Sequence, residues 1–547
     1  MKYTGLIIFF LLIRLGLVAS VLQSTDQPTG DTCHVINGKI SDYISYPNAG
    51  LVTSSDGNIY TATCNRDKNI DKNTSIVLRC FNPDGSPNQY IPPVSYKIGL
   101  ECSLVKMVID SDDNIYMVLG YKPDQTDSSD VQLVKYNLQL QLIWEILIAS
   151  YGQPVAKDMT IDNAGNIWIT GGYFIGSWGL LLITKIQPDG QKLFGEGFSF
   201  GNQGSAITTD MAGHAYVCGY RSFEGVHNFI AMAFDQDGNL FWSKSFDGES
   251  RKNDSLDIAY DCISVNGFLY VAGSLNLKSK TTNASQQVVY KIRERDGRID
   301  WFRTSSSGQT HADAAKKILT DFKGNIYIAG EAYDNQQITL TKYDTSGNLK
   351  FTEAYTADPD AATTGKEFFV LNDFYKLASD SFYLYGHIKD YAEDGSFNTI
   401  HGFIIQYSND GSLLSENESN VGDFLVITGN SNNNMIYSVS SVPFLQSVND
   451  VDASYYLHIF TNIPTTAPVS LHKLNYLLYP TAAHEWLNIS NASGGEIYFY
   501  NVYDQLTWKT QLSFGDNILN VSNLPRGIYM IKIVFKNKVE DQKIILL

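Results

Sequence analysis

The sequence predicts an all-β fold: a β-propeller of eight four-stranded blades, closed by an N-terminal strand and followed by a small C-terminal β-sandwich. Three observations predict it. A segment of the Gly-Asn-Ile-Tyr type recurs eight times before residue 440, each recurrence carries a pattern of four short strands, and the period is lost after residue 464. Repeats of about 50 residues are typical of propellers and solenoids, and antiparallel four-stranded units favour the propeller.

The recurring segment is clearest at residues 321–330, which read DFKGNIYIAG. Each copy has an aromatic residue in the same place: Tyr60, Tyr116, Trp168, Tyr216, Tyr270, Tyr327, Tyr383 and Tyr437. Neighbouring aromatic positions are 48 to 57 residues apart, and the last two copies are degenerate.

Each unit reads as four strands joined by tight turns. In the sixth unit we predict strands at 317–320, 326–330, 338–343 and 349–354. The turns between them combine an Asp, which bonds its own backbone, with a Gly that accepts positive φ. The second strand is apolar on both faces, as expected for a blade packed between two others. Glycines near its end predict a bulge or a close backbone approach: Gly120, Gly172, Gly219, Gly273, Gly330 and Gly386.

The two ends of the repeat region complement each other. The last unit has strands at 424–427, 435–439 and 455–460 but no fourth, and residues 34–46 form an orphan strand before the first unit. If these pair, two exposed sheet edges disappear. We therefore predict eight blades, with seven as the alternative if one degenerate unit is an insertion.

The N-terminus indicates export. Residues 1–20 read as a signal peptide: a short basic start, an apolar run over 6–18, and small residues before a cleavage site. An uncleaved anchor is the alternative. No other stretch has the roughly 20 apolar residues needed to span a bilayer. The domains are then the propeller at 33–463, a linker at 464–471 with two prolines, and the sandwich at 472–547.

Net charge limits the classes of binding partner, and the cysteine content bears on disulfide formation. A net charge of −17 argues against binding to nucleic acid or anionic membranes, which require basic patches. The six cysteines permit disulfides in an exported protein. Cys64 and Cys80 end neighbouring strands and are the best candidate pair, with buried thiols as the alternative.

The last 75 residues carry a recognisable series of motifs. Leu478-Tyr479-Pro480 is followed by IYFYNVYD at 497–504 and by LNVSNLPRGIYMIKI at 519–533. This series resembles the type A C-terminal sorting domain of the type IX (Por) secretion system, with motif residues Tyr479, Pro480, Leu524, Gly527 and Tyr529. It departs from the family pattern because the second proline of the opening motif and the glycine after the Tyr-Asp pair are absent. A generic binding sandwich is the alternative.

The resemblance implies Bacteroidota-type export, with the type IX secretion machinery as partner of the C-terminal domain and a final place on the cell surface or outside the cell. The repeats themselves resemble bacterial propeller repeats, a likeness that is specific for architecture and nearly silent on activity.

Chemical motifs are weak. Asp110–Asn114 and Asp235–Asn239 place oxygens at alternate positions, as calcium loops do, but turn chemistry explains the same residues. No other cofactor and no catalytic residue is assigned. The nine histidines show no metal-binding spacing, and His214, which replaces an Asn in a turn, is assigned to the surface.

The polar loops 122–130, 275–287 and 389–398 are candidate ligand contacts, because rigid scaffolds present function on loops. Tyr173, Phe174 and Trp178 could stack on sugars, with strand packing as the alternative. We predict a binding module for a glycan or protein. The alternative is an enzyme acting on extracellular polysaccharide, a lyase or glycosidase, which requires two carboxylates, or a His and a carboxylate, at a pocket. Asp158, placed just before the first strand of its unit, is one carboxylate of this kind.

Overall fold

The structure is a computed structural model. It describes residues 20–24, 33–38, 49–66, 74–99, 101–122, 129–150, 153–175, 178–198, 203–223, 226–246, 257–276, 285–306, 313–321, 323–332, 337–356, 366–377, 381–391, 397–419, 423–430, 435–447, 450–461, 477–479, 482–483, 486–501, 506–535 and 538–546. The chain divides into two compact units, His34–Pro468 with Met1–Leu22 and Val469–Leu547 with Gln23–Cys33. The predicted signal peptide, except Ser20, and the predicted linker lie outside the described residues. Nothing described forms a helix long and apolar enough to cross a membrane.

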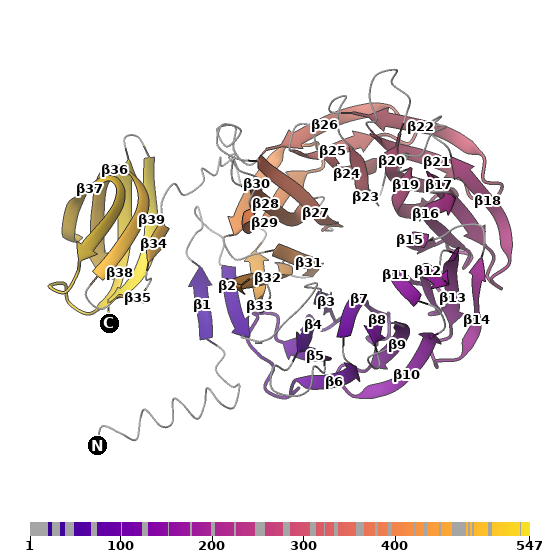
Figure 1. Cartoon of the computed structure of the whole chain (residues 1–547), viewed down its shortest axis with the longest axis horizontal. Coiled ribbons are helices and arrows are strands. Elements are labelled where there is room, and N and C mark those ends of the chain that lie inside the picture. Colours follow the sequence, from indigo (N-terminus) through magenta and orange to yellow (C-terminus); the bar gives the residue numbers. More distant parts are fainter. Residues whose placement is uncertain are drawn as a thin grey trace. The chain divides into compact units, whose positions relative to one another are not determined.

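The first unit is the predicted propeller, and Figure 1 shows its sheets following one another around a ring. Among the described residues it contains eight antiparallel sheets. Blades 1 to 4 are β3 (Ala49–Thr53) to β6 (Val94–Gly99), β7 (Glu101–Ile109) to β10 (Leu142–Ala149), β11 (Gln153–Ile161) to β14 (Lys192–Phe198), and β15 (Gln203–Thr209) to β18 (Leu240–Phe246). The strands between these are β4 (Ile59–Arg66), β5 (Thr74–Phe81), β8 (Ile115–Lys122), β9 (Asp130–Tyr136), β12 (Ile167–Ile175), β13 (Trp178–Ile186), β16 (Ala215–Phe223) and β17 (Val226–Phe234).

Blades 5 to 7 repeat the pattern. They are β19 (Ile258–Val265) to β22 (Ile299–Ser305), β23 (Ala314–Thr320) to β26 (Leu349–Tyr355), and β27 (Lys366–Lys376) to β30 (Leu413–Ser419). Their middle strands are β20 (Phe268–Leu275), β21 (Gln286–Arg293), β24 (Ile326–Ala332), β25 (Gln337–Tyr343), β28 (Ser381–Tyr391) and β29 (Phe397–Ser408). The four strands predicted for the sixth unit are therefore confirmed.

Blade 8 joins both ends of the repeat region. It consists of β31 (Asp423–Asn430), β32 (Met435–Ser447), β33 (Asp450–Thr461), β2 (Cys33–Gly38) and β1 (Ser20–Ser24). The predicted N-terminal strand is thus β2, which pairs with β33 through Ile36 opposite Leu457. Blade 8 in turn packs on blade 1, where the Tyr437 hydroxyl donates to the Pro83 carbonyl at 3.2 Å. Among the described residues eight blades are present, not seven.

The innermost strands of blades 2 to 7 carry bulges, and four of the predicted glycines face them: Gly219, Gly273, Gly330 and Gly386. Gly120 instead lies one position away, opposite Ser103. In blade 5 the register shifts between Ala259 and Asp261, and Gly273 lies opposite the bulge. A Cβ atom on Gly273 would come within 2.2 Å of the Ile258 carbonyl oxygen, so only glycine fits there. In blade 3 the corresponding glycine is Gly171 rather than the expected Gly172.

The predicted disulfide does not fit the sheet register. Cys80 lies opposite Tyr60 and Cys64 opposite Ile76, which separates the two cysteines by four residues along the ladder. That is about 13 Å, whereas disulfide-bonded Cα atoms lie roughly 4.4–6.8 Å apart. Cys64 and Cys80 are not joined by a disulfide in the described part of the chain. The Cys64 thiol instead contacts that of Cys102 in the next blade, and this contact together with burial raises its pKa.

The second unit is the predicted small β-structure. Its sheet contains β34 (Leu477–Tyr479), β35 (Ala482–Ala483), β36 (Trp486–Asn501), β37 (Leu506–Asn520), β38 (Gly527–Phe535) and β39 (Lys538–Leu546). The long β36 pairs with β34 near its start, with β38 near its end, and with β37 along both parts. These strands enclose a core formed by Leu487, Ile497, Phe499, Leu512, Leu519, Val521, Tyr529 and Ile531.

Candidate functional site

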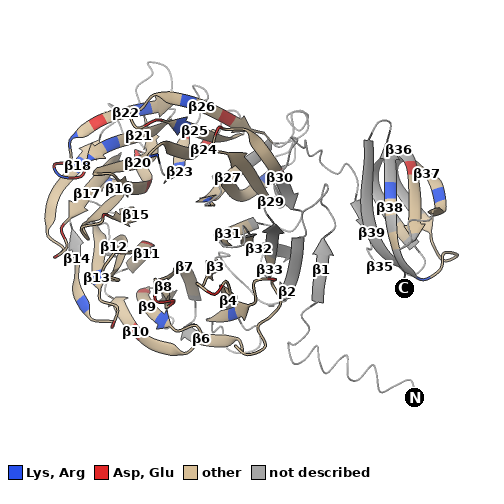
Figure 2. Ribbon diagram, turned by 180° about the vertical axis from the view of Figure 1, so that it is seen from behind, with Lys and Arg blue, Asp and Glu red and all other residues tan. Residues whose placement is uncertain are grey.

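Five charged side chains share one repeated position on the innermost strands. In each case the residue directly follows the bulge: Lys106, Asp158, Asp261, Lys317 and Asp373. Asp158 therefore lies inside β11. The sequence-based prediction, which placed it just before this strand, is wrong. Although burial lowers the pKa of Lys317, carboxylates of other blades, Asp373 and Asp261 foremost, outweigh burial and raise it. Most of the remaining ribbon of the blades is neither acidic nor basic (Figure 2).

The aspartates of this set hold neighbouring blades together. Asp158 accepts hydrogen bonds from its own bulge, at Met159 N, and from Ile207 N of the next blade, both at 2.8 Å. Asp261 accepts in the same way from the next blade, at Ile318 N (3.0 Å). These carboxylates are already used as structural acceptors, which leaves little for catalysis at the inner wall.

Ion pairs complete the inner set. Lys106 Nζ lies 2.5 Å from Asp158 Oδ1, and Lys317 Nζ lies 3.1 Å from Asp373 Oδ1. Burial raises the pKa of Asp261 to about 6, and the nearby Asp373 carboxylate adds to this, while Lys317 acts in the opposite direction. The raised pKa shows that the inner wall disfavours the ionised form of Asp261.

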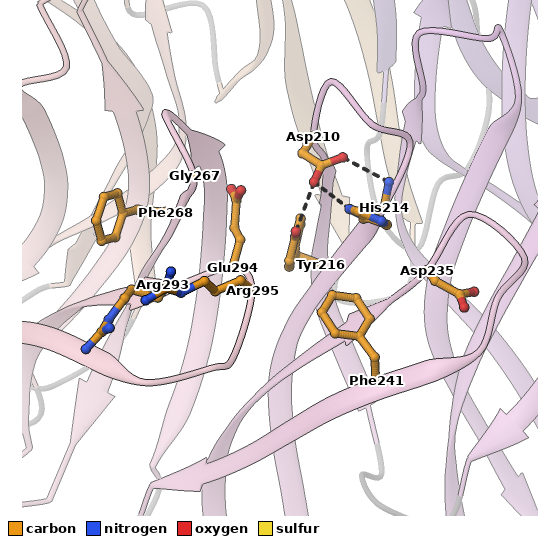
Figure 3. Close-up of a pocket in the computed structure, with 10 residues that line it drawn as sticks. All are labelled: Asp210, His214, Tyr216, Asp235, Phe241, Gly267, Phe268, Arg293, Glu294 and Arg295. Carbon is orange, nitrogen blue, oxygen red and sulfur yellow. Dashed lines mark hydrogen bonds and ion pairs between the residues drawn. The ribbon is translucent and has the colours of Figure 1, made fainter.

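A pocket of about 680 Å³ lies between blades 4 and 5, beside the turns that join first to second and third to fourth strands (Figure 3). Three carboxylates, two arginines, a histidine and three aromatic rings line it: Asp210, His214, Tyr216, Asp235, Phe241, Gly267, Phe268, Arg293, Glu294 and Arg295. Of these residues, the sequence points only to Asp235, as part of a possible calcium loop, and to His214, as a surface residue.

Asp210 and His214 form one wall of the pocket. The Asp210 carboxylate accepts from the Tyr216 hydroxyl at 3.0 Å and lies 2.8 Å from His214 Nδ1. Burial raises the pKa of Asp210, but these hydrogen bonds and that of the His214 backbone N–H outweigh burial and lower it. Asp110, Asp162 and Asp321 make the corresponding turn bonds in other blades, so Asp210 is first of all a turn residue.

Glu294 lies between that wall and the two arginines (Figure 3). Its side chain is buried, with 8% exposure, and one carboxylate oxygen accepts from Ser264 Oγ at 2.6 Å. Burial raises the pKa of Glu294, and the Asp210 carboxylate adds to the effect. Within the described part of the chain, no lysine or arginine lies within ion-pair distance of Glu294, whereas Arg295 contacts Asp296 at 3.7 Å.

Other blade junctions show a repeated lysine contact. In blades 2, 3, 5 and 6 a lysine lies directly opposite the aromatic residue of the second strand. Its ammonium donates to the carbonyl of the second residue in the outer turn of the next blade. The pairs are Lys135 with Pro188 (2.9 Å), Lys185 with Gln236 (2.8 Å), Lys291 with Thr345 (2.8 Å) and Lys342 with Asn409 (2.7 Å).

Blade 4 breaks this pattern. Ala233 lies opposite Tyr216, in the place of the lysine. The corresponding carbonyl of blade 5 belongs to Glu294 and accepts from Trp242 Nε1 at 2.6 Å. The residues that match Glu294 in blades 3, 4, 6 and 7 are all uncharged. The junction therefore lacks the usual cation and gains a carboxylate, and the pocket opens there. The corresponding residues of blades 1, 7 and 8 are Cys80, Gln406 and Ile459, so blade 4 is not alone in lacking the lysine. What sets blade 4 apart is the combination of Ala233 with Glu294 in the facing turn.

The other sequence-predicted sites fall elsewhere. Asp110 accepts from the backbone of Asp112 and Asn114, and Asp235 from that of Asn239, as turn chemistry requires. In the described ranges no group of three or more His, Cys, Asp or Glu residues is placed to hold a metal ion. The centres of the three candidate loops lie outside the described residues. Tyr173 packs against the core between blades 2 and 3, and nothing is described of the side chains of Phe174 and Trp178.

The sorting-domain motif residues fall in the second unit. The Tyr529 side chain is 3% exposed, and its hydroxyl donates to the Pro525 carbonyl at 2.8 Å. Leu524 packs against the same core, and Gly527 begins β38. Tyr479 ends β34, while Pro480 lies outside the described residues. The Leu-Pro-Arg-Gly-Ile-Tyr segment therefore forms the turn and strand start that bury Tyr529.

One comparison with known proteins identifies the C-terminal unit. Residues 477–547 match the model of the secretion system C-terminal sorting domain. No curated protein matches the chain. Among solved structures, a eukaryotic initiation factor is 8% identical with a TM-score of 0.38, covering 73% of this chain and 96% of that one.

Two further structures are similar at the same level. A protein of unknown function from Dyadobacter fermentans is 10% identical with a TM-score of 0.34, covering 65% of this chain and 94% of that one. A polysaccharide lyase is 10% identical with a TM-score of 0.35, covering 80% and 94%. These values support no statement about the activity of this chain. The C-terminal unit is a type IX sorting domain, and the chain is exported to the cell surface or the extracellular space.

Proposed function

We propose that this exported propeller is a binding module, and that its ligand contacts the pocket between blades 4 and 5. The observation that carries the proposal is the contrast between the inner wall and this pocket. The inner carboxylates are held in backbone hydrogen bonds and ion pairs, whereas the pocket offers a buried Glu294 without a cationic partner beside aromatic rings. Concave sites with a few polar groups among aromatic side chains favour ligand binding.

The glycan or protein ligand is best sought with the whole exported chain. The test is a screen on glycan and peptide arrays, with and without calcium, followed by analysis of each bound ligand for chemical change. We expect retention of at least one ligand without turnover. Absence of any bound ligand contradicts the proposal, and turnover of a bound ligand replaces it with an enzyme. If ligand binding requires calcium, the acidic turns Asp110–Asn114 and Asp235–Asn239 become candidate calcium-binding sites.

One observation favours the enzyme as a second candidate. His214 and the Asp210 carboxylate form a hydrogen-bonded pair next to Glu294, whose raised pKa suits a proton donor. A lyase or glycosidase acting on polysaccharide would use such groups. Release of reducing or unsaturated ends from array-positive glycans, abolished by His214→Gln, would establish this candidate.

We further infer that residues 1–20 direct passage across the inner membrane and that the C-terminal domain contacts the type IX machinery. Deleting residues 472–547 is expected to leave the protein in the periplasm. Normal surface delivery after this deletion would contradict the role of the domain.

A further inference from the structure

We propose that the pocket between blades 4 and 5 binds a primary ammonium group, such as a lysine side chain of a partner peptide. The ligand would take the place that a lysine of the chain itself fills at four other junctions. This inference rests on the proposed binding function and names its ligand class.

The occupied junctions show what holds an ammonium at this position. Each lysine donates to one turn carbonyl at 2.7 to 2.9 Å and lies near the ring of the second-strand aromatic. At blade 3 the ammonium of Lys185 is 4.7 Å from the Trp168 ring and 3.4 Å from the Asp162 carboxylate. A carbonyl, an aromatic face and a turn carboxylate together form a site for an ammonium.

The same three partners are present between blades 4 and 5. The Glu294 carbonyl replaces that of Gln236, the Tyr216 ring replaces that of Trp168, and Asp210 replaces Asp162. Only the ammonium is missing, because Ala233 ends at its Cβ atom and is fully buried. The phenyl ring of Phe241, 5.6 Å from the ring of His214, offers an apolar surface for the aliphatic part of a ligand.

Charge favours the same ligand. Glu294 is nine-tenths buried, and burying a carboxylate without a cation is costly. Arg293 and Arg295 line the pocket on the side of Glu294 away from Asp210 (Figure 3). An arriving ammonium would meet the Glu294 carboxylate directly. Its three N–H donors match the Glu294 carbonyl, the Glu294 carboxylate and Asp210.

Calorimetric titration of the full exported chain with Nα-acetyl-lysine amide tests the proposal, with the same compound acetylated at Nε as the matched probe. We expect binding of the first probe and at least about tenfold weaker binding of the second, because acetylation removes the charge. Glu294→Gln is expected to weaken binding at least about tenfold. Ala233→Lys is expected to abolish it, because its own ammonium fills the site. Asp237→Asn, which removes a charge from the adjacent exposed turn, is the control and should change little.

Equal affinity for both probes, no binding of either, or unchanged affinity in Glu294→Gln would overturn the proposal. Thermal melts of each variant show whether it folds, and Glu294→Gln decides the question if Ala233→Lys does not fold. If the array screen yields a ligand whose binding is unaffected by Ala233→Lys, the ligand class is wrong while the binding function stands. An array without any ligand contradicts the binding function itself.

Discussion

The junctions on the two sides of blade 4 differ in one buried charge. Between blades 3 and 4, the Lys185 ammonium contacts the Gln236 carbonyl at 2.8 Å and the Asp162 carboxylate at 3.4 Å. Between blades 4 and 5, Ala233 stands opposite Tyr216 in the place of the lysine, and Glu294 lines the neighbouring pocket. The comparison teaches that neighbouring blades pack with or without this lysine, and that the pocket lies where its absence coincides with Glu294 in the facing turn.

The two junctions also differ in how their carboxylates titrate. Burial raises the pKa of Asp162, but hydrogen bonds from Asn166 and Trp168 and the charge of Lys185 outweigh it and lower the pKa. Glu294 has no such cation, and burial raises its pKa. The ionised Asp162 carboxylate therefore stabilises the folded state, whereas the ionised Glu294 carboxylate destabilises it.

The largest effect is expected from removing the lysine where it is present. Lys185→Ala should lower the free energy of unfolding by about 3–5 kcal/mol, because the buried Asp162 carboxylate loses its cation. Equilibrium urea unfolding measures it. Lys350→Ala, which breaks the more exposed pair with Asp344, is the control and should have little effect. Equal losses of unfolding free energy in Lys185→Ala and Lys350→Ala would show that the buried lysine contributes no more than an exposed one.

A smaller difference is expected between two tryptophans. Trp242 Nε1 donates to the Glu294 carbonyl at 2.6 Å, and no lysine shares that carbonyl. Trp301 Nε1 donates to the Thr345 carbonyl at 3.3 Å, which also accepts from Lys291. Trp242→Phe should therefore cost about 1–3 kcal/mol and Trp301→Phe about 1 kcal/mol or less. Equal losses of unfolding free energy in the two variants, or the reverse order, would contradict a special dependence of the Glu294 carbonyl on Trp242.

The smallest expected effect is on melting temperature, whose pH dependence should have opposite signs in Glu294→Gln and Asp162→Asn. A raised pKa makes ionised Glu294 a cost that grows as pH rises above about 4, so Glu294→Gln should gain in relative melting temperature between pH 4 and 7. A lowered pKa makes ionised Asp162 stabilising, and this contribution is lost as pH falls below about 4. Asp162→Asn should therefore lose most in melting temperature near neutral pH. Parallel pH profiles of the two variants would contradict this assignment.

Much of the fold follows from the sequence because repetition amplifies weak local signals. The turn Asp and Gly residues, the apolar second strand and the unpaired strands at both ends specify eight blades and the pairing of β2 with β33. The sorting domain was predicted from the motif that ends in Tyr529, whose burial explains why that position is aromatic.

The site could not be predicted in the same way, because it depends on what one repeat lacks. Ala233 carries no chemistry by itself, and Glu294 lies in a turn that is one residue longer than its counterparts. Asp210 and Tyr216 of blade 4 meet Glu294 of blade 5 in one pocket only because the two blades pack side by side. The disulfide prediction failed for a related reason, since the ladder register between Cys64 and Cys80 is not visible in their spacing.

The unfolding free energy of Ala233→Lys tests the central claim most directly. If the pocket is the vacant counterpart of the lysine sites, the new ammonium will pair with the Glu294 carboxylate and carbonyl, and the variant will be more stable than the parent chain by about 1–3 kcal/mol at pH 7. A variant that is less stable than the parent chain would show that the pocket is not the vacant counterpart of the lysine sites, and this account of the junction would be wrong.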